Sequence, residues 1–220
     1  MSSSTGLNDR RLLPGVLKAL AAVLAIVAYQ VLVHWAMTDG RIDGPGRVLA
    51  IATVLAAAAW LVHMAAKAGR SWIAAVLATG TAGLVWALWA SSPELLYVIP
   101  HVAAYVFLLG LFGRTLLPPR EALITSIARH VHGELPGPIE AYTRRVTWAW
   151  SLFFAGMALT SVLLYAFAPL AAWSFFANLM NLPLIAAMFL TEYLYRIVRF
   201  PDFSHASFIT TVRSFWKFHA

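Results

Sequence analysis

The segment Val146–Ala168 reads VTWAWSLFFAGMALTSVLLYAFA and contains no charged residue. Arg144 and Arg145 stand immediately before it, and Pro169 immediately follows it. An α-helix rises about 1.5 Å per residue, so a helix of this length crosses the roughly 30 Å hydrocarbon core of a bilayer. The segment is therefore predicted to be a transmembrane helix that begins at a cationic boundary.

The rest of the chain has the same apolar character. Of its 220 residues, 61% are hydrophobic and 11% are charged, whereas soluble domains carry about 25% charged residues. Alternation of polar and apolar residues, typical of membrane strands, is lacking. We therefore expect an all-α, polytopic integral membrane protein with about six transmembrane helices. The predicted spans are Val16–Met37, Arg47–Ala66, Trp72–Ala90, Leu95–Phe112, Val146–Ala168 and Ala171–Leu194.

Lysine and arginine predict the orientation of these spans, because cytoplasmic loops carry an excess of both residues. With both termini inside, fourteen of the 16 lie on the cytoplasmic side, and only Arg41 and Arg47 lie outside. We expect a multi-pass protein of the bacterial inner membrane. The fourteen are Arg10, Arg11, Lys18, Lys67, Arg70, Arg114, Arg120, Arg129, Arg144, Arg145, Arg196, Arg199, Arg213 and Lys217.

This orientation predicts five segments along the chain. Residues 1–15 form a cytoplasmic N-terminus and residues 16–113 a four-helix membrane half. Residues 114–145 form a cytoplasmic connector, residues 146–194 a transmembrane hairpin, and residues 195–220 a cytoplasmic tail. The first apolar run exceeds the length of a signal-peptide core, so we expect it to be retained.

Two short basic amphipathic helices are predicted on the cytoplasmic side, over Arg120–Val131 and Ala206–Phe218. The first places Leu123, Ile124, Ile127 and Val131 on one face. Each helix is too short and too charged to span. Each could lie on the inner leaflet or dock against the protein's own cytoplasmic ends, and the sequence leaves both alternatives open.

Polar residues at membrane depth are costly unless they have partners, so they are candidate site residues. Asn178, Asn181 and Glu192 share one face of the last predicted span at 3.6 residues per turn. We expect Glu192 to pair with Arg144 or Arg145. This cluster could stabilise helix packing, or it could form a cytoplasmic pocket for a headgroup or an acyl-chain end. Its residues are Tyr142, Thr143, Arg144, Arg145, Asn178, Asn181 and Glu192.

Histidines and charges suggest no catalytic centre or cofactor. A single histidine in a span usually hydrogen-bonds to a neighbouring helix. The predicted spans contain His34, His63 and His101, and their spacing in the sequence assigns them no functional role. His130 and His132 point to different faces of a helix, so no metal site is expected. Cysteine is absent, which excludes thiolate chemistry. The net charge is +7, and the basic residues flank apolar segments. The expected partner is therefore the anionic inner leaflet, not nucleic acid.

The C-terminal half carries a more specific pattern, over roughly residues 100–200. It includes the block Tyr142–Thr147 (YTRRVT), with polar residues at the entrance of a span. This half resembles a family of uncharacterised bacterial inner-membrane proteins encoded among the fatty-acid-synthase-like enzymes of aryl polyene and xanthomonadin-type pigment clusters. The other matching positions are Phe112-Gly113, Leu117-Pro118, Ile127-Ala128-Arg129, Leu135-Pro136, Trp150, Phe153-Phe154, Trp173, Asn178, Glu192 and Tyr195-Arg196.

The resemblance implies a non-catalytic accessory or scaffold component of a polyene or lipid biosynthetic system, with soluble enzymes or an acyl carrier as partners. Some members of the family are named as ketosynthases, but a Cys-His-His condensing site is impossible without cysteine. Two alternatives stay open. One is a lipid-handling enzyme or carrier that uses the polar cluster. The other is an envelope scaffold, because the C-terminal hairpin is similar to the intracellular septation protein A family.

Overall fold

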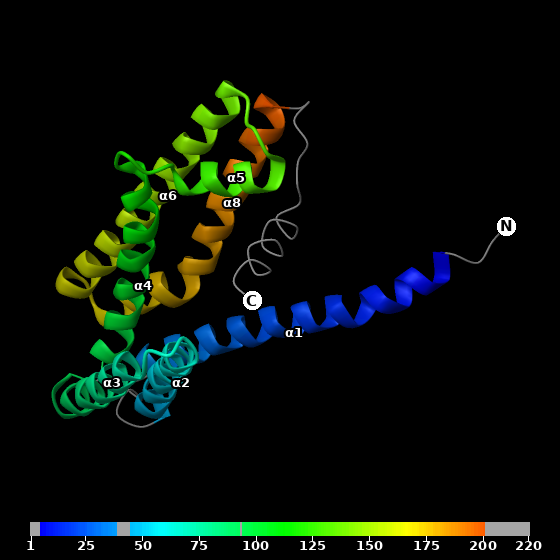
Figure 1. Cartoon of the computed structure of the whole chain (residues 1–220). Helices are drawn as coiled ribbons and strands as arrows, with labels where there is room; N and C mark the ends of the chain where they lie inside the picture. The colour runs from blue at the N-terminus through cyan, green and yellow to red at the C-terminus, as the bar shows by residue number, and fades with distance from the viewer. Residues whose placement is uncertain (1–4, 39–44, 93, 201–220) are drawn as a thin grey trace. The chain divides into compact units, whose positions relative to one another are not determined.

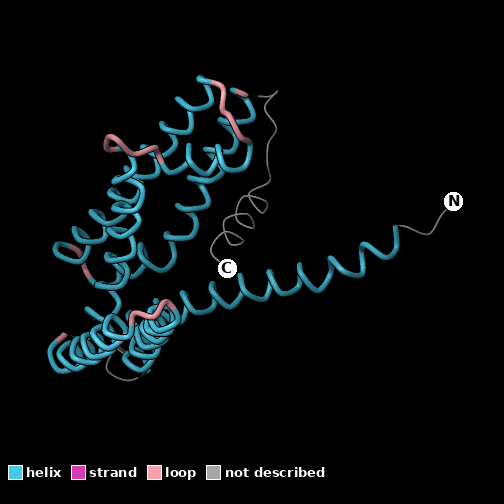
Figure 2. The backbone as a smooth tube through the Cα atoms, in the orientation of Figure 1, coloured by secondary structure: helices cyan, strands magenta, loops and turns pink. Residues whose placement is uncertain are grey.

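Every regular element that the structure describes is a helix (Figures 1 and 2). The structure is a computed structural model that describes residues 5–38, 45–92 and 94–200. The helices are α1 (Thr5–Thr38), α2 (Pro45–Lys67), α3 (Ser71–Ser91), α4 (Leu95–Gly113), the 3₁₀-helix η2 (Arg114–Leu116), α5 (Leu123–His132), α6 (Gly137–Phe167), α7 (Leu170–Ser174), the π-helix η3 (Phe175–Met180) and α8 (Asn181–Arg199).

The predicted apolar segments coincide with helices α1, α2, α3, α4 and α6, and with the run from α7 to α8. The helix predicted between Arg120 and Val131 corresponds to α5. The helix predicted over Ala206–Phe218 lies outside the described residues. The all-helical part of the prediction is thus confirmed for the described ranges.

Among the described residues, three helices are long and apolar enough to cross a membrane: Leu95–Leu116, Gly137–Phe167 and Leu170–Arg199. Three shorter apolar helices, Val23–Thr38, Ile51–Lys67 and Ser71–Trp86, accompany them. Large apolar side chains are exposed along these helices, as lipid-facing surfaces require. The architecture is that of a membrane protein.

Packing divides the described chain into two compact units. The first comprises residues up to Tyr97 together with Pro169–Asn181, and the second comprises Val98–Ala168 together with the residues from Leu182 onward. Each unit therefore combines segments that are far apart in the sequence.

In the first unit, α2 and α3 form a hairpin (Figure 1). Its turn contains Gly69 at a φ of 71°, a backbone conformation that favours glycine. The N–H groups of Gly69 and Arg70 donate to Ala66 O and Ala65 O, both at 3.0 Å. These bonds satisfy carbonyls at the end of α2 that have no partner within the helix.

The first unit also contains α1, which packs against α2, α7 and η3. Tyr29 on α1 and Thr53 on α2 join through their hydroxyl groups at 2.7 Å. Leu96 is buried against Ile51 of α2 and Val85 of α3, among others. The contacts of α1 with α7 and η3 thus bring the beginning of the last apolar segment against the first helix.

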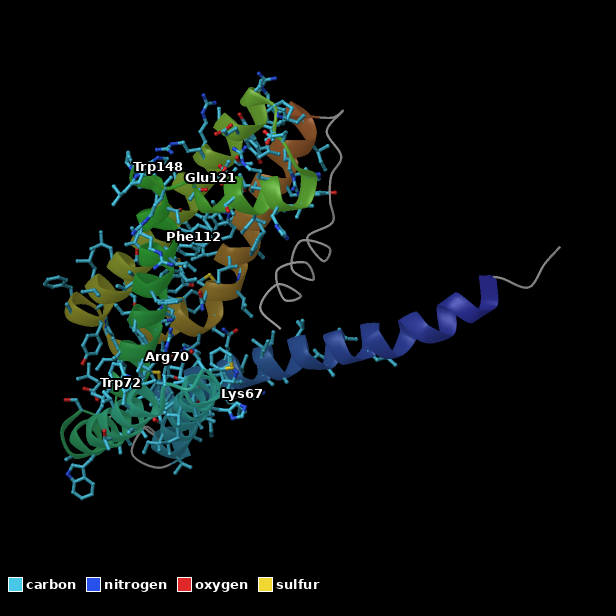
Figure 3. The ribbon with its side chains drawn as sticks, in the orientation of Figure 1. Lys67, Arg70, Trp72, Phe112, Glu121 and Trp148 are labelled. Carbon is cyan, nitrogen blue, oxygen red and sulfur yellow. The ribbon has the colours of Figure 1, made fainter. Side chains whose placement is uncertain are left out.

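In the second unit, aromatic side chains form the core between α4, α6 and α8. The rings of Trp150 on α6 and Phe189 on α8 are 4.6 Å apart, and those of Phe112 on α4 and Phe154 on α6 are 5.1 Å apart. Figure 3 labels Phe112 within this core. Because aromatic rings bury a large apolar area, this cluster fixes the packing of the three helices.

The short helix α5 docks on α6. The hydroxyl groups of Thr125 on α5 and Thr143 on α6 lie 2.8 Å apart, and both side chains are buried. The side of α5 that contains Ala122 and Thr125 is buried, whereas the predicted apolar face, with Leu123 and Ile127, is only partly buried. The structure therefore shows that α5 packs against the chain itself, through α6.

The first turn of α5 is capped by other segments of the chain. Its own N-cap residue, Ala122, makes no side-chain cap. Instead, the Leu123 N–H donates to Thr115 Oγ1 at 3.0 Å and the Ile124 N–H donates to Thr147 Oγ1 at 3.2 Å. N–H groups in the first turn of a helix have no partner within it, so these threonines attach α5 both to η2 and to α6.

Candidate functional site

The YTRR block lies within α6, because this helix begins nine residues before the predicted span. Pro136 is the N-cap of α6, and Pro138 is tolerated in its first turn because the missing N–H would have no helical partner. Tyr142 and Thr143 are buried, while Arg144 and Arg145 are exposed. Successive helical residues are rotated by about 100°, so the block presents two residues inward and two outward.

Glu192 on α8 pairs with the inward tyrosine and not with the outward arginines. The Tyr142 hydroxyl donates to Glu192 Oε1 at 2.8 Å, and Arg196 Nε lies 3.7 Å from the same oxygen. The expected pairing with Arg144 or Arg145 was therefore wrong. Arg144 instead donates from Nη2 to Leu116 O at 3.0 Å. Arg196 was missed, although it lies four residues after Glu192, a spacing that favours a helical ion pair.

Aromatic rings surround the Tyr142–Glu192 contact. The rings of Tyr142 and Tyr195 stack at 5.7 Å and 13°, and Phe200 lies 5.0 Å from Tyr142. The Arg196 guanidinium lies 5.7 Å from the centre of the Tyr193 ring. This cluster of Tyr142, Glu192 and Arg196, which we call the tyrosine–glutamate cluster, combines a hydroxyl, a carboxylate and a guanidinium at the end of two apolar helices.

The remaining members of the predicted cluster lie elsewhere. Thr143 bonds to Thr125 of the docked helix, and therefore serves the attachment of α5. Asn178 and Asn181 belong to the first unit, whereas Glu192 belongs to the second. The π-helix Phe175–Met180 also widens the helical step around Asn178, so a register counted at 3.6 residues per turn does not hold there.

In the first unit, Asn178 takes part in a polar contact that includes His34. Asn178 Nδ2 donates to both the carbonyl and the hydroxyl oxygen of Ser174 at 3.1 Å. Ser174 Oγ lies 3.0 Å from His34 Nδ1 on α1, and Ser174 is fully buried. The expectation that such histidines bond to a neighbouring helix is confirmed for His34. Ser174 itself was missed, because one serine in an apolar run gives no signal.

A second group that the sequence did not indicate surrounds Arg129 on α5. Its Nε bonds to Glu121 Oε1 at 2.8 Å, and its two terminal nitrogens lie 3.5 Å from Glu134 and 3.6 Å from Glu140. The hydrogen bond and the charge of Glu121 raise the pKa of Arg129 above its ordinary value. This group, the Arg129 network, holds together the connector on both sides of α5.

Compared with known proteins, the chain matches no family model, no curated protein and no solved structure.

Proposed function

We propose that the chain is a non-catalytic accessory protein of the bacterial inner membrane, which holds soluble enzymes of a polyene or lipid biosynthetic system at the membrane. It crosses the membrane six times, with both ends in the cytoplasm. The distribution of lysine and arginine supports this orientation, because fourteen of the 16 then face inside. The family resemblance of the C-terminal half supports the biosynthetic context.

The observation that carries this proposal is the fixed geometry of the connector. Thr115, Thr125 and Thr147 attach α5 at three points, and the Arg129 network ties the residues on either side of it. A connector that only joined two spans would not need these contacts. A rigid surface loses little conformational freedom when a partner binds, so such a surface is suited to docking a soluble enzyme or an acyl carrier.

The tyrosine–glutamate cluster favours a second candidate, a lipid-handling protein. Glu192 and Arg196 side chains are 19% and 28% exposed, so both could contact a headgroup while the stacked rings contact its acyl chain. Under this alternative, Glu192→Gln abolishes function, because it removes the charge and leaves the shape.

The experiment is complementation of a deletion strain, followed by profiling of pigments and lipids. We expect the polyene product to be lost on deletion and restored by the wild type and by Glu192→Gln. A Thr125→Val/Thr147→Val variant, which weakens the attachment of α5, should restore less of it at equal protein level. Restoration by this variant but not by Glu192→Gln would favour the lipid-handling candidate.

Deletion can also give results that contradict both candidates. Unchanged pigments and lipids together with altered cell length would identify an envelope scaffold of the septation type.

A second experiment tests the orientation. Cysteine labelling of single-cysteine variants would overturn it if residues 120–140 were found outside the cytoplasm. The native chain contains no cysteine, so each introduced thiol reports on one site.

A further inference from the structure

Three exposed arginines lie at the turn that joins α4 to the connector, and a fourth is adjacent to one of them in the chain. Arg144 and Arg145 lie on α6, Arg114 begins η2, and Arg120 follows two prolines. Arg144 Nη2 donates to Leu116 O at 3.0 Å, and Arg120 Nη1 donates to Arg114 O at 3.4 Å. Two guanidinium groups are thus held against the same three-residue helix, beside the arginine that begins it.

The carboxylates of the second unit pair with other arginines. Among the residues described in this unit, four carboxylates occur, and each pairs with Arg129 or Arg196. The four are Glu121, Glu134, Glu140 and Glu192. Since none of these described carboxylates pairs with the four exposed arginines, the arginines give this part of the unit a positive surface charge, which attracts an anion.

An apolar strip extends from this surface along α6. Arg144, Trp148 and Leu152 follow one another at intervals of four residues, which places them on one helical face. Trp148 and Leu152 are 50% and 65% exposed, and Leu117, next to η2, is 63% exposed. Figure 3 labels Trp148. The order of cation, indole and aliphatic side chain matches the passage from headgroups to acyl chains in a bilayer.

We propose that this arginine surface (Arg114, Arg120, Arg144 and Arg145) binds the phosphate headgroup of an anionic phospholipid, whose acyl chains lie along Trp148 and Leu152. A guanidinium carries five N–H donors, and Arg120 and Arg144 each use one of them on the turn. The remaining donors can bind phosphate oxygens in pairs. The site goes beyond the proposed function, because it requires no soluble partner and does not include the tyrosine–glutamate cluster.

Native mass spectrometry of the full-length chain in detergent tests this site. Phosphatidylglycerol and phosphatidylcholine with identical acyl chains are added in turn, and the retained lipid is counted. We expect the wild type to retain phosphatidylglycerol preferentially, and Arg120→Gln/Arg144→Gln to weaken this retention roughly tenfold. The matched control is Lys67→Gln/Arg70→Gln, which removes the same charge from exposed positions in and after α2 (Figure 3) and should retain the lipid as the wild type does.

Equal retention of both lipids by the wild type would overturn the proposal. Equal losses in the test and control variants would also overturn it, because they would indicate a general charge effect. Release of phosphatidylglycerol by excess inorganic phosphate would identify a site for free phosphate instead. If Arg120→Gln/Arg144→Gln does not fold, the variant Arg114→Gln/Arg145→Gln is tested in its place. Weaker retention of phosphatidylglycerol by this variant supports the lipid site, and unchanged retention refutes it.

Discussion

The two units use polar contacts of different kinds to join their helices. In the first unit, Ser174 links His34 to Asn178 and is fully buried. In the second unit, Tyr142 and Arg196 bind the carboxylate of Glu192, whose side chain keeps 19% exposure. A hydroxyl with two partners can be enclosed at little cost, whereas a carboxylate in low dielectric needs a cation, a hydrogen bond or water. The first contact suits a structural role alone, whereas the second can also interact with an outside ligand.

Ser174→Ala should have the largest effect on stability. It leaves His34 and Asn178 without the hydroxyl, at a cost of about 2 kcal/mol in the free energy of unfolding. Unfolding of the purified protein in mixed micelles with denaturing detergent measures this loss. The control is Thr79→Ala, because Thr79 lies exposed on α3 and its hydroxyl donates to carbonyls of its own helix. A loss no greater than that of the control would show that the enclosed contact contributes nothing.

Tyr142→Phe should have a smaller effect, because it removes the hydroxyl and keeps the ring stacked on Tyr195. We expect a loss of about 1 kcal/mol, since the Glu192 carboxylate retains Arg196 and some contact with water. A double-mutant cycle with Glu192→Gln measures the coupling of the two side chains. A coupling near zero would mean that the two residues act independently, contrary to their 2.8 Å contact.

Thr125→Val should weaken the docking of α5 by about 0.5–1 kcal/mol, while global unfolding changes little. Hydrogen exchange followed by mass spectrometry measures this effect, because faster exchange in residues 123–132 reports local opening. Ser126→Ala, at an exposed position on the same helix, serves as the control. Exchange that rises equally in both variants would argue against the buried threonine pair as the attachment.

Arg129→Gln should have the smallest effect, because exposed ion pairs are screened by salt. We expect no measurable change in the unfolding midpoint at physiological ionic strength. At low ionic strength, α5 should exchange its amide hydrogens faster in the variant than in the wild type. A large loss of stability at high salt would show that the Arg129 network contributes more than surface electrostatics.

Composition and helical periodicity predicted much of the fold. Long apolar runs bounded by arginine, such as Val146–Ala168, indicate helices because only a helix satisfies its own backbone in lipid. The rotation of side chains about the helix axis was harder to predict. Tyr142 and Arg144 differ by about 200° around α6, and no local pattern shows which of them faces α8. The sequence therefore predicts Arg144 or Arg145 as the partner of Glu192, although Tyr142 occupies that position.

The contact of His34 with Ser174 shows a second reason for incomplete prediction. These residues are 140 positions apart, and their approach depends on how α1 packs against α7. The π-helix that follows Ser174 also depends on tertiary packing, because its wide turn is rarely favoured by local sequence. Interactions that depend on such packing are not visible in the periodicity of a single segment.

The first turn of α5 is capped by Thr115 and Thr147, which lie outside this helix. This arrangement has a consequence for the biogenesis of the protein. During synthesis, α5 precedes α6, so Thr147 is translated after the first turn of α5. A ten-residue helix without its caps is marginal in water. We therefore expect the first turn of α5 to become stable only after α6 has formed beside it. The order of translation therefore makes the docking of α5 a step that follows formation of the helix that supports it.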